Sequence, residues 1–83
     1  MYLEVDFPDG STSLVPADAA AEIARGLWHR FQQPGAITAA ALIEEGMRAP
    51  KGTRRIKLDQ SQADAVQSAL DSARHLQATI RRR

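Results

Sequence analysis

The sequence predicts an α+β fold in which a three-stranded antiparallel sheet carries helices on one face. Residues 2–7 alternate between apolar and polar side chains, as a half-buried strand does, whereas residues 20–31 and 66–80 repeat apolar side chains every three or four positions, as helices do. Together with the turn residues between them, these segments give the element order ββααβα. We expect the strand order 2-1-3, with the helical connection returning the third strand antiparallel to the first.

A β-hairpin over residues 2–15 is the first predicted unit. Pro8, Asp9 and Gly10 form the turn, because proline favours its first corner and glycine tolerates a positive φ. The second strand follows as Ser11 to Val15. The side chains of the first strand that should face the core are Leu3, Val5 and Phe7, and those that should face away are Tyr2, Glu4 and Asp6.

The first helix is predicted over residues 17–32, with the acidic Asp18 near its positively polarised start. Its apolar side is formed by Ala20, Ile23, Ala24, Leu27 and Phe31. Trp28 lies about 80° from the centre of that side by helical geometry. We therefore expect the core to cover the indole only in part.

The second helix is predicted over residues 38–48. Thr38 is the expected N-cap residue, and Ile37 should contact Leu42 across the first turn.

A third strand over residues 53–58 and a last helix over residues 61–81 complete the predicted fold. Ser61 and Asp64 have the spacing of a capping box at the start of this helix. Apolar residues recur along it at seven-residue spacing as Val66, Ala73 and Ile80, and we expect this seam to pack on the sheet.

Composition indicates one small domain spanning residues 1–83. The chain has 43% apolar and 25% charged residues and no cysteine, which excludes disulfides and thiolate metal sites. The longest apolar run, from Ala36 to Ile43, is too short to span a bilayer, and no secretion leader is recognisable. A cytoplasmic protein without membrane contact is the expectation.

Charge is distributed unevenly along the chain. Residues 1–45 hold seven acidic and two basic residues, a net charge of −5, whereas residues 46–83 hold nine basic and three acidic residues, a net charge of +6. If the third strand lies beside the first, Arg55 and Lys57 face Glu4 and Asp6 across the sheet. Part of the asymmetry is then neutralised within the fold.

Six basic residues remain as candidates for binding an anionic partner. Arg48, Lys51 and Arg54 fall on the predicted loop before the third strand, and Arg81, Arg82 and Arg83 end the predicted last helix. They favour either a solvated surface or a site for carboxylates or phosphates. No aromatic residues are interleaved with them, as single-strand nucleic-acid surfaces usually have.

Residues 54–58 (Arg-Arg-Ile-Lys-Leu), followed by a helix, resemble the opening of a ribbon-helix-helix DNA-binding subunit. The resemblance implies a strand that pairs with a dimer mate. It covers about a quarter of the chain, and a complete hairpin and two helices precede the strand, so we do not assign the family.

No catalytic or metal site is predicted, and no cofactor. His29 and His75 are far apart, and neither has a second imidazole or thiolate nearby in the sequence. His75 follows Asp71 by four residues, so we expect those two side chains to pair on the helix surface.

Trp28 is the main candidate for contact with another protein, because tryptophan is enriched at the centres of interfaces. Tyr2 on the open sheet face is a second candidate. The second strand is expected to be an outer edge, which offers a route to a homodimer. The sequence thus predicts a non-enzymatic protein-interaction or accessory module, with a protein partner or a second copy favoured and no small-molecule substrate. A nucleic-acid-binding regulator that uses residues 48–57 and the C-terminal arginines is the alternative.

Overall fold

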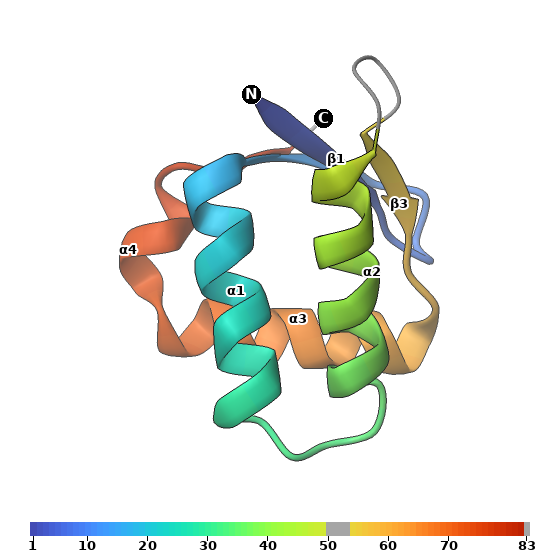
Figure 1. Ribbon diagram of the computed structural model, residues 1–83, viewed down its shortest axis with the longest axis vertical. Coiled ribbons are helices and arrows are strands. Elements are labelled where there is room, and N and C mark those ends of the chain that lie inside the picture. Colours follow the sequence, from blue (N-terminus) through green and yellow to red (C-terminus); the bar gives the residue numbers. More distant parts are fainter. Residues whose placement is uncertain (50–53, 83) are drawn as a thin grey trace.

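The computed structural model describes residues 1–49 and 54–82 and confirms the α+β class and the predicted order of the first six elements (Figure 1). A short helix and a two-residue strand follow them. The elements are β1 (Tyr2–Asp6), β2 (Thr12–Pro16), α1 (Ala17–His29), α2 (Ala36–Arg48), β3 (Arg55–Lys57), α3 (Gln60–Ser72), α4 (Arg74–Gln77) and β4 (Arg81–Arg82).

The predicted hairpin is present, with β1 and β2 paired antiparallel from Tyr2–Pro16 to Asp6–Thr12. Gly10 adopts the positive φ that the turn requires, at +91°. The Asp9 carboxylate accepts hydrogen bonds from the backbone N–H and the hydroxyl of Ser11, at 2.8 and 2.6 Å. Local side-chain chemistry therefore sets this turn, as the sequence indicates.

The sheet is mixed, and the prediction of a purely antiparallel sheet is wrong. The strand order is β3-β1-β2-β4, which contains the predicted 2-1-3 order, but β3 runs parallel to β1. The reason is that α1 and α2 form an antiparallel pair of equal length (Figure 1). They return the chain to the end of the sheet where β2 finished and β1 began, so β3 starts beside the start of β1.

The predicted continuous helix over residues 61–81 is also wrong. It stops at Ser72, because Ala73 has φ −126° and ψ 69°, outside the helical region. The Gln77 side chain donates to the carbonyl of Leu70 at 2.9 Å, which satisfies an acceptor that a continuing helix would have used. The chain then forms α4 and β4.

Strand β4 pairs with β2, through Leu14–Arg81 and Ser13–Arg82. The expectation that β2 is an open edge is therefore wrong. Among the described strands, the outer ones are β3 and β4.

Two helix starts differ from their predicted positions. Helix α2 begins at Ala36 after Gly35 at φ +82°, and the Thr38 hydroxyl donates to the Gly35 carbonyl at 3.1 Å instead of capping the helix. Helix α3 is capped by Asp59, whose carboxylate accepts from the Gln62 N–H at 2.8 Å while the Gln62 side chain accepts from the Asp59 N–H at 2.9 Å. The capping box exists, two residues before the predicted one.

The core lies between one face of the sheet and the layer of α1, α2 and α3. Leu3, Val5, Val15 and Ile56 cover the sheet side, and the large buried residues of α1 and α2 are Ile23, Leu27 and Ile43. Alanine is the most frequent core residue, which lets the helices approach closely. The buried alanines are Ala19, Ala20, Ala24, Ala36, Ala39, Ala40, Ala63, Ala65 and Ala69.

Candidate functional site

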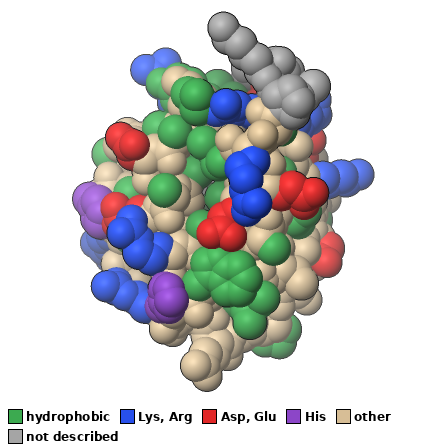
Figure 2. All heavy atoms as spheres, in the orientation of Figure 1, with side chains coloured by type: hydrophobic (Ala, Val, Ile, Leu, Met, Phe, Trp, Pro, Cys, Tyr) green, Lys and Arg blue, Asp and Glu red, His purple; other side chains and the backbone are tan. Residues whose placement is uncertain are grey.

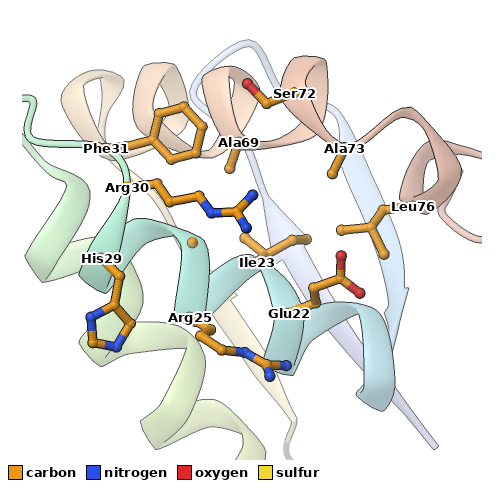
Figure 3. A pocket seen from close by; sticks show the side chains of 11 residues that line it. Glu22, Ile23, Arg25, His29, Arg30, Phe31, Ala69, Ser72, Ala73 and Leu76 are labelled. Carbon is orange, nitrogen blue, oxygen red and sulfur yellow. The ribbon is translucent and has the colours of Figure 1, made fainter.

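A groove of about 460 Å³ runs between α1 and the α3–α4 segment. Its apolar floor consists of Ile23 from α1, Phe31 after α1, and Ala69, Ala73 and Leu76 from the opposite wall (Figure 3). The break at Ala73 turns the chain away from the axis of α3, so α4 closes one end of the groove instead of extending the wall. We refer to this feature as the α1 groove.

The rim of the α1 groove is mainly cationic. Arg25 and Arg30 line it together with the imidazole of His29, and the one carboxylate among the lining residues is that of Glu22. The Arg30 guanidinium reaches across the groove between Ile23 and Ala69 (Figure 3). Within the described residues, neither Arg25 nor Arg30 forms an ion pair, whereas Glu22 Oε2 lies 2.8 Å from His75 Nε2. The acid of the rim therefore already has a partner, and the two arginines do not.

The contact between His75 and Glu22 corrects the predicted pairing of His75 with Asp71. The helix breaks between these two residues, and the Asp71 carboxylate accepts instead from the Gln67 side chain at 2.9 Å. His75 consequently ties α4 to α1 across the end of the groove.

A second surface surrounds Trp28 on the exposed side of the α1–α2 pair. The Trp28 side chain is 40% exposed, and Ile37 is 61% exposed on the first turn of α2. Since the two helices are antiparallel, both residues lie at the end where α1 and α2 are joined, and Ile37, the residue predicted to contact Leu42, remains exposed. Figure 2 shows a hydrophobic cluster over this part of the pair, with acidic and basic side chains above it. We call it the Trp28 face.

Tyr2, the other predicted contact residue, belongs to a different surface. It is 47% exposed, and by strand alternation it shares the open face of the sheet with Glu4 and Asp6, whereas Leu3 and Val5 face the helices. Tyr2 and Trp28 are therefore on opposite sides of the sheet, and the structure does not bring them together.

The predicted basic residues gather at one end of the molecule but on both sides of the sheet. Arg48 ends α2 and Arg54 precedes β3, near both termini (Figure 1). Arg54 is partly buried, and its Nη1 is enclosed without a hydrogen bond. Exposed Arg81 lies on the open face, in one row across the sheet with Leu14 and Glu4. Lys51, Arg83 and the side chain of Arg82 lie outside the described part of the chain.

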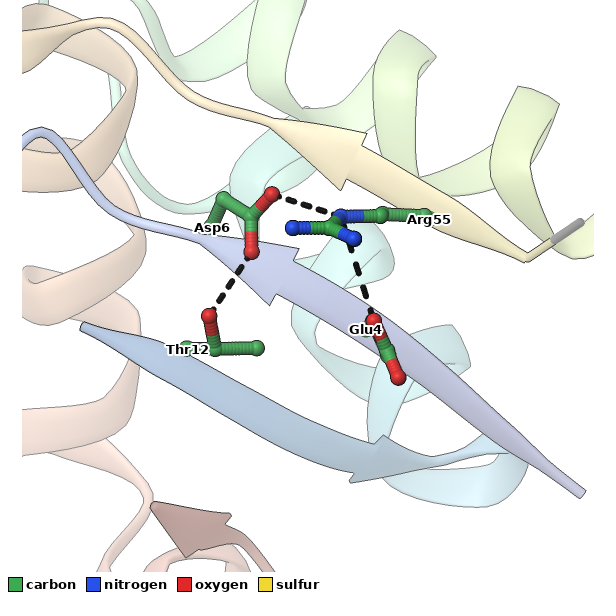
Figure 4. Close-up of polar contacts among 4 residues, drawn as sticks. All are labelled: Glu4, Asp6, Thr12 and Arg55. Carbon is green, nitrogen blue, oxygen red and sulfur yellow. Dashed lines mark hydrogen bonds and ion pairs between the residues drawn. The ribbon is translucent and has the colours of Figure 1, made fainter. Parts of the chain in front are cut away.

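The predicted pairing of charges between the first and third strands is present. In register, Arg55 lies opposite Glu4 and Lys57 opposite Asp6. The direct bond is diagonal, from Arg55 Nε to Asp6 Oδ2 at 2.7 Å, with Glu4 Oε2 at 3.8 Å (Figure 4). Hydrogen bonds from Arg55 and then from the Thr12 hydroxyl hold the pKa of Asp6 below its usual value of 3.8.

The α1 groove is the feature that the sequence analysis missed. Its residues come from three segments, and their convergence depends on the break at Ala73, which the apolar spacing does not reveal. One signal was present in the sequence: Gly26 falls inside the predicted first helix, where glycine is unfavourable. The apolar spacing of the helix does not explain why residue 26 is glycine.

Among residues 1–49 and 54–82, no three side chains of the metal-ligating types cluster, and no helix in that part of the chain is long and apolar enough to cross a membrane. Comparisons of the chain with protein-family models, with curated proteins and with solved structures find no match.

Proposed function

We propose that the protein is a non-enzymatic interaction module that binds another protein, or a second copy of itself, through the Trp28 face. The observation that carries the proposal is the exposure of Trp28 and Ile37 at the same end of the α1–α2 pair. The exposed large hydrophobic residues of the described chain are Met1, Tyr2, Trp28 and Ile37, of which only Trp28 and Ile37 belong to the α1–α2 pair. Tryptophan is enriched at the centres of protein interfaces.

Surrounding charges support a protein partner over a membrane or a solvent role. Glu44 and Arg48 follow Ile37 on α2 by seven and eleven positions, so helical spacing places them on the same side of the helix as Ile37. Apolar contacts rimmed by charges of both signs are typical of protein interfaces, in which the rim sets orientation and the centre supplies affinity.

The single tryptophan makes the proposal directly measurable. Burial of Trp28 in an interface should shift its emission to shorter wavelengths. For self-association the shift should grow with protein concentration and coincide with a dimer mass in light scattering. For a different partner, the shift should appear only when that partner is added.

Variants distinguish binding through the Trp28 face from nonspecific hydrophobic association. Trp28→Ser combined with Ile37→Ser should abolish dimerisation or weaken capture of a partner from the native cell by at least about tenfold. Tyr2→Ser is the matched control, because it removes an exposed aromatic from the other side of the sheet. Equal capture by all three proteins would contradict the proposal.

The second candidate is nucleic-acid binding at the basic end. The observation that favours it is that Arg54 precedes Arg55, which lies in one cross-strand row with Glu4, Leu14 and Arg81, while α2 ends at Arg48 near both termini (Figure 1). Mobility shift on mixed DNA and RNA is the test. Binding at low salt that falls steeply with added salt, and that Arg48→Gln weakens, would support it; absence of binding at low salt would eliminate it.

A further inference from the structure

The α1 groove has a charge that nothing in the described structure neutralises. Its rim carries the guanidinium groups of Arg25 and Arg30 without ion-pair partners, while the only carboxylate, that of Glu22, is bonded to His75. A ligand that enters the groove therefore meets two guanidinium groups without ion-pair partners and a single carboxylate, one oxygen of which already contacts His75. Charge complementarity favours a ligand with carboxylates or other anionic groups.

The floor beneath these cations is apolar. Ile23 and Leu76 are buried residues at the base, and Ala69 and Ala73 present small side chains on the opposite wall. The Ser72 hydroxyl adds one polar group on that wall. A ligand that matches both layers must carry aliphatic side chains next to its anionic groups, which is the property of an acidic amphipathic peptide segment.

Gly26 provides an independent indication of close approach. It lies in α1 and lines the groove, and a Cβ atom built on it would meet only Phe31 Cε2, at an ordinary 3.8 Å. Internal packing therefore does not require glycine here, although glycine weakens a helix interior relative to alanine. In contrast, a Cβ on the helical Gly46 would lie 2.8 Å from both Ile56 Cγ2 and Leu3 Cδ1. The core explains Gly46, whereas internal packing does not explain Gly26.

We infer that the α1 groove binds an acidic amphipathic segment of a partner protein, with its carboxylates on Arg25 and Arg30 and its backbone close to Gly26. The aliphatic side chains of the segment lie over Ile23 and Leu76. A polynucleotide has phosphates for the arginines but no aliphatic side chains for this floor, so it matches only half of the site. The groove lies on the α3 side of α1 and the Trp28 face on the α2 side, so this inference does not depend on the proposed function.

The test uses a short fluorescein-labelled peptide in which leucine recurs every third or fourth position and glutamate fills the rest. A peptide with lysine for every glutamate and a single-stranded oligonucleotide serve as comparison probes. Anisotropy titrations with the full chain should show binding of the acidic peptide, weaker at high salt, and at least about tenfold weaker binding of the basic one.

Three variants locate the binding. The double variant Arg25→Gln, Arg30→Gln should bind the acidic peptide about tenfold more weakly or worse, because it loses two charge-assisted contacts. Arg48→Gln, which removes an exposed helix arginine outside the groove, should leave the affinity unchanged. Gly26→Ala should weaken binding while raising the midpoint of thermal unfolding, so a loss of affinity there cannot be ascribed to unfolding.

The outcomes that overturn the inference are equally specific. It is wrong if both peptides bind alike, if the double arginine variant binds like the unmodified protein, or if the oligonucleotide binds as tightly as the acidic peptide and loses affinity in the same variant. Unchanged affinity in Gly26→Ala would contradict the close approach of the backbone. Trp28→Ser should keep the peptide affinity, so failure of this inference and failure of the Trp28 face give different results.

Discussion

Helix α2 and helix α1 meet the rest of the molecule in different ways. On the α2 side the chain is packed so closely that two glycines leave no room for a methyl group. A Cβ on Gly35 would lie 2.5 Å from the backbone carbon of Ser61, and one on Gly46 would lie 2.8 Å from side chains of the sheet. This is the contact that joins α2 to the sheet and to the start of α3.

On the α1 side the packing is looser. The groove of about 460 Å³ separates α1 from the α3–α4 segment, and a cavity of about 20 Å³ lies beneath it, between Ile23, Leu70, Ile80 and the sheet. Ser13, 2% exposed, is the only polar side chain lining that cavity, and its hydroxyl makes no hydrogen bond within the described structure. The contrast is between a close contact on the α2 side and open volume on the α1 side.

Gly35→Ala should reduce the stability of the protein most, because alanine there is both strained in its backbone and too large for the space on the α2 side. Alanine at φ +82° is strained, and its Cβ would overlap the backbone of Ser61, which cannot rotate away as a side chain can. We expect a loss of about 2–5 kcal/mol in the free energy of unfolding, measured by urea denaturation followed by circular dichroism.

Gly10→Ala is the matched control for this prediction. Gly10 has a similar φ of +91°, but a Cβ there would meet nothing within 4 Å. It should lose only the strain component, about 1–2 kcal/mol. If both variants lose the same free energy of unfolding, the backbone of Ser61 does not restrict the space next to Gly35.

Gly46→Ala and Gly26→Ala should change stability in opposite directions. Both glycines are helical, so both gain about 0.5–1 kcal/mol of helix propensity when replaced by alanine. At Gly46 the clash with Leu3 and Ile56, both buried, costs about 1–3 kcal/mol and outweighs this gain, so we expect a net loss of about 0.5–2 kcal/mol. At Gly26 the gain should remain. If both variants lose stability on thermal unfolding, the looseness assigned to the α1 side is wrong.

Ser13→Val should stabilise the protein by about 1–2 kcal/mol, because it removes an unpaired buried hydroxyl and partly fills the adjoining cavity. Ser13→Thr is the control, since threonine has the shape of valine and retains the hydroxyl. The valine variant should be more stable than the threonine variant in the same urea titration. Equal stability of the two would mean that the hydroxyl finds a partner.

Much of the α2 side could be predicted from sequence. The hairpin, the two helices and the third strand follow from alternation, apolar spacing and turn residues, all of which act over a few positions. The pairing of Arg55 with Glu4 and Asp6 followed from the strand order alone. The direction of β3 did not, because it depends on the out-and-back path of two helices of equal length, which is a global property of the chain.

The α1 side could be predicted far less well. The spacing of Val66, Ala73 and Ile80 is compatible with one long helix, and the actual break depends on the bond from Gln77 to the Leu70 carbonyl and on the pairing of β4 with β2. Ile80 still packs against the core, but from outside any helix. The spacing of apolar residues predicts that a residue is buried, but it does not predict which secondary structure the residue belongs to.

The smallest effect concerns the β3 edge of the sheet, where Asp6 holds β3 to β1 through Arg55. On the opposite edge, the described side chain of Arg81 forms no ion pair within the described residues. Since the pKa of Asp6 is lowered in the folded state, its carboxylate stabilises the fold above the unfolded pKa, near 3.8, and this contribution is lost as the pH falls through the folded pKa. The unmodified protein should therefore be more stable than Asp6→Asn at neutral pH. The difference should shrink below about pH 4 and vanish once Asp6 is protonated.

Urea titrations of both proteins across this pH range isolate the contribution of Asp6, because all other carboxylates are present in both. The difference in stability between the two proteins should be smaller when both also carry Arg55→Gln. If the difference between the unmodified protein and Asp6→Asn does not change with pH, the β3 edge is held by backbone pairing alone.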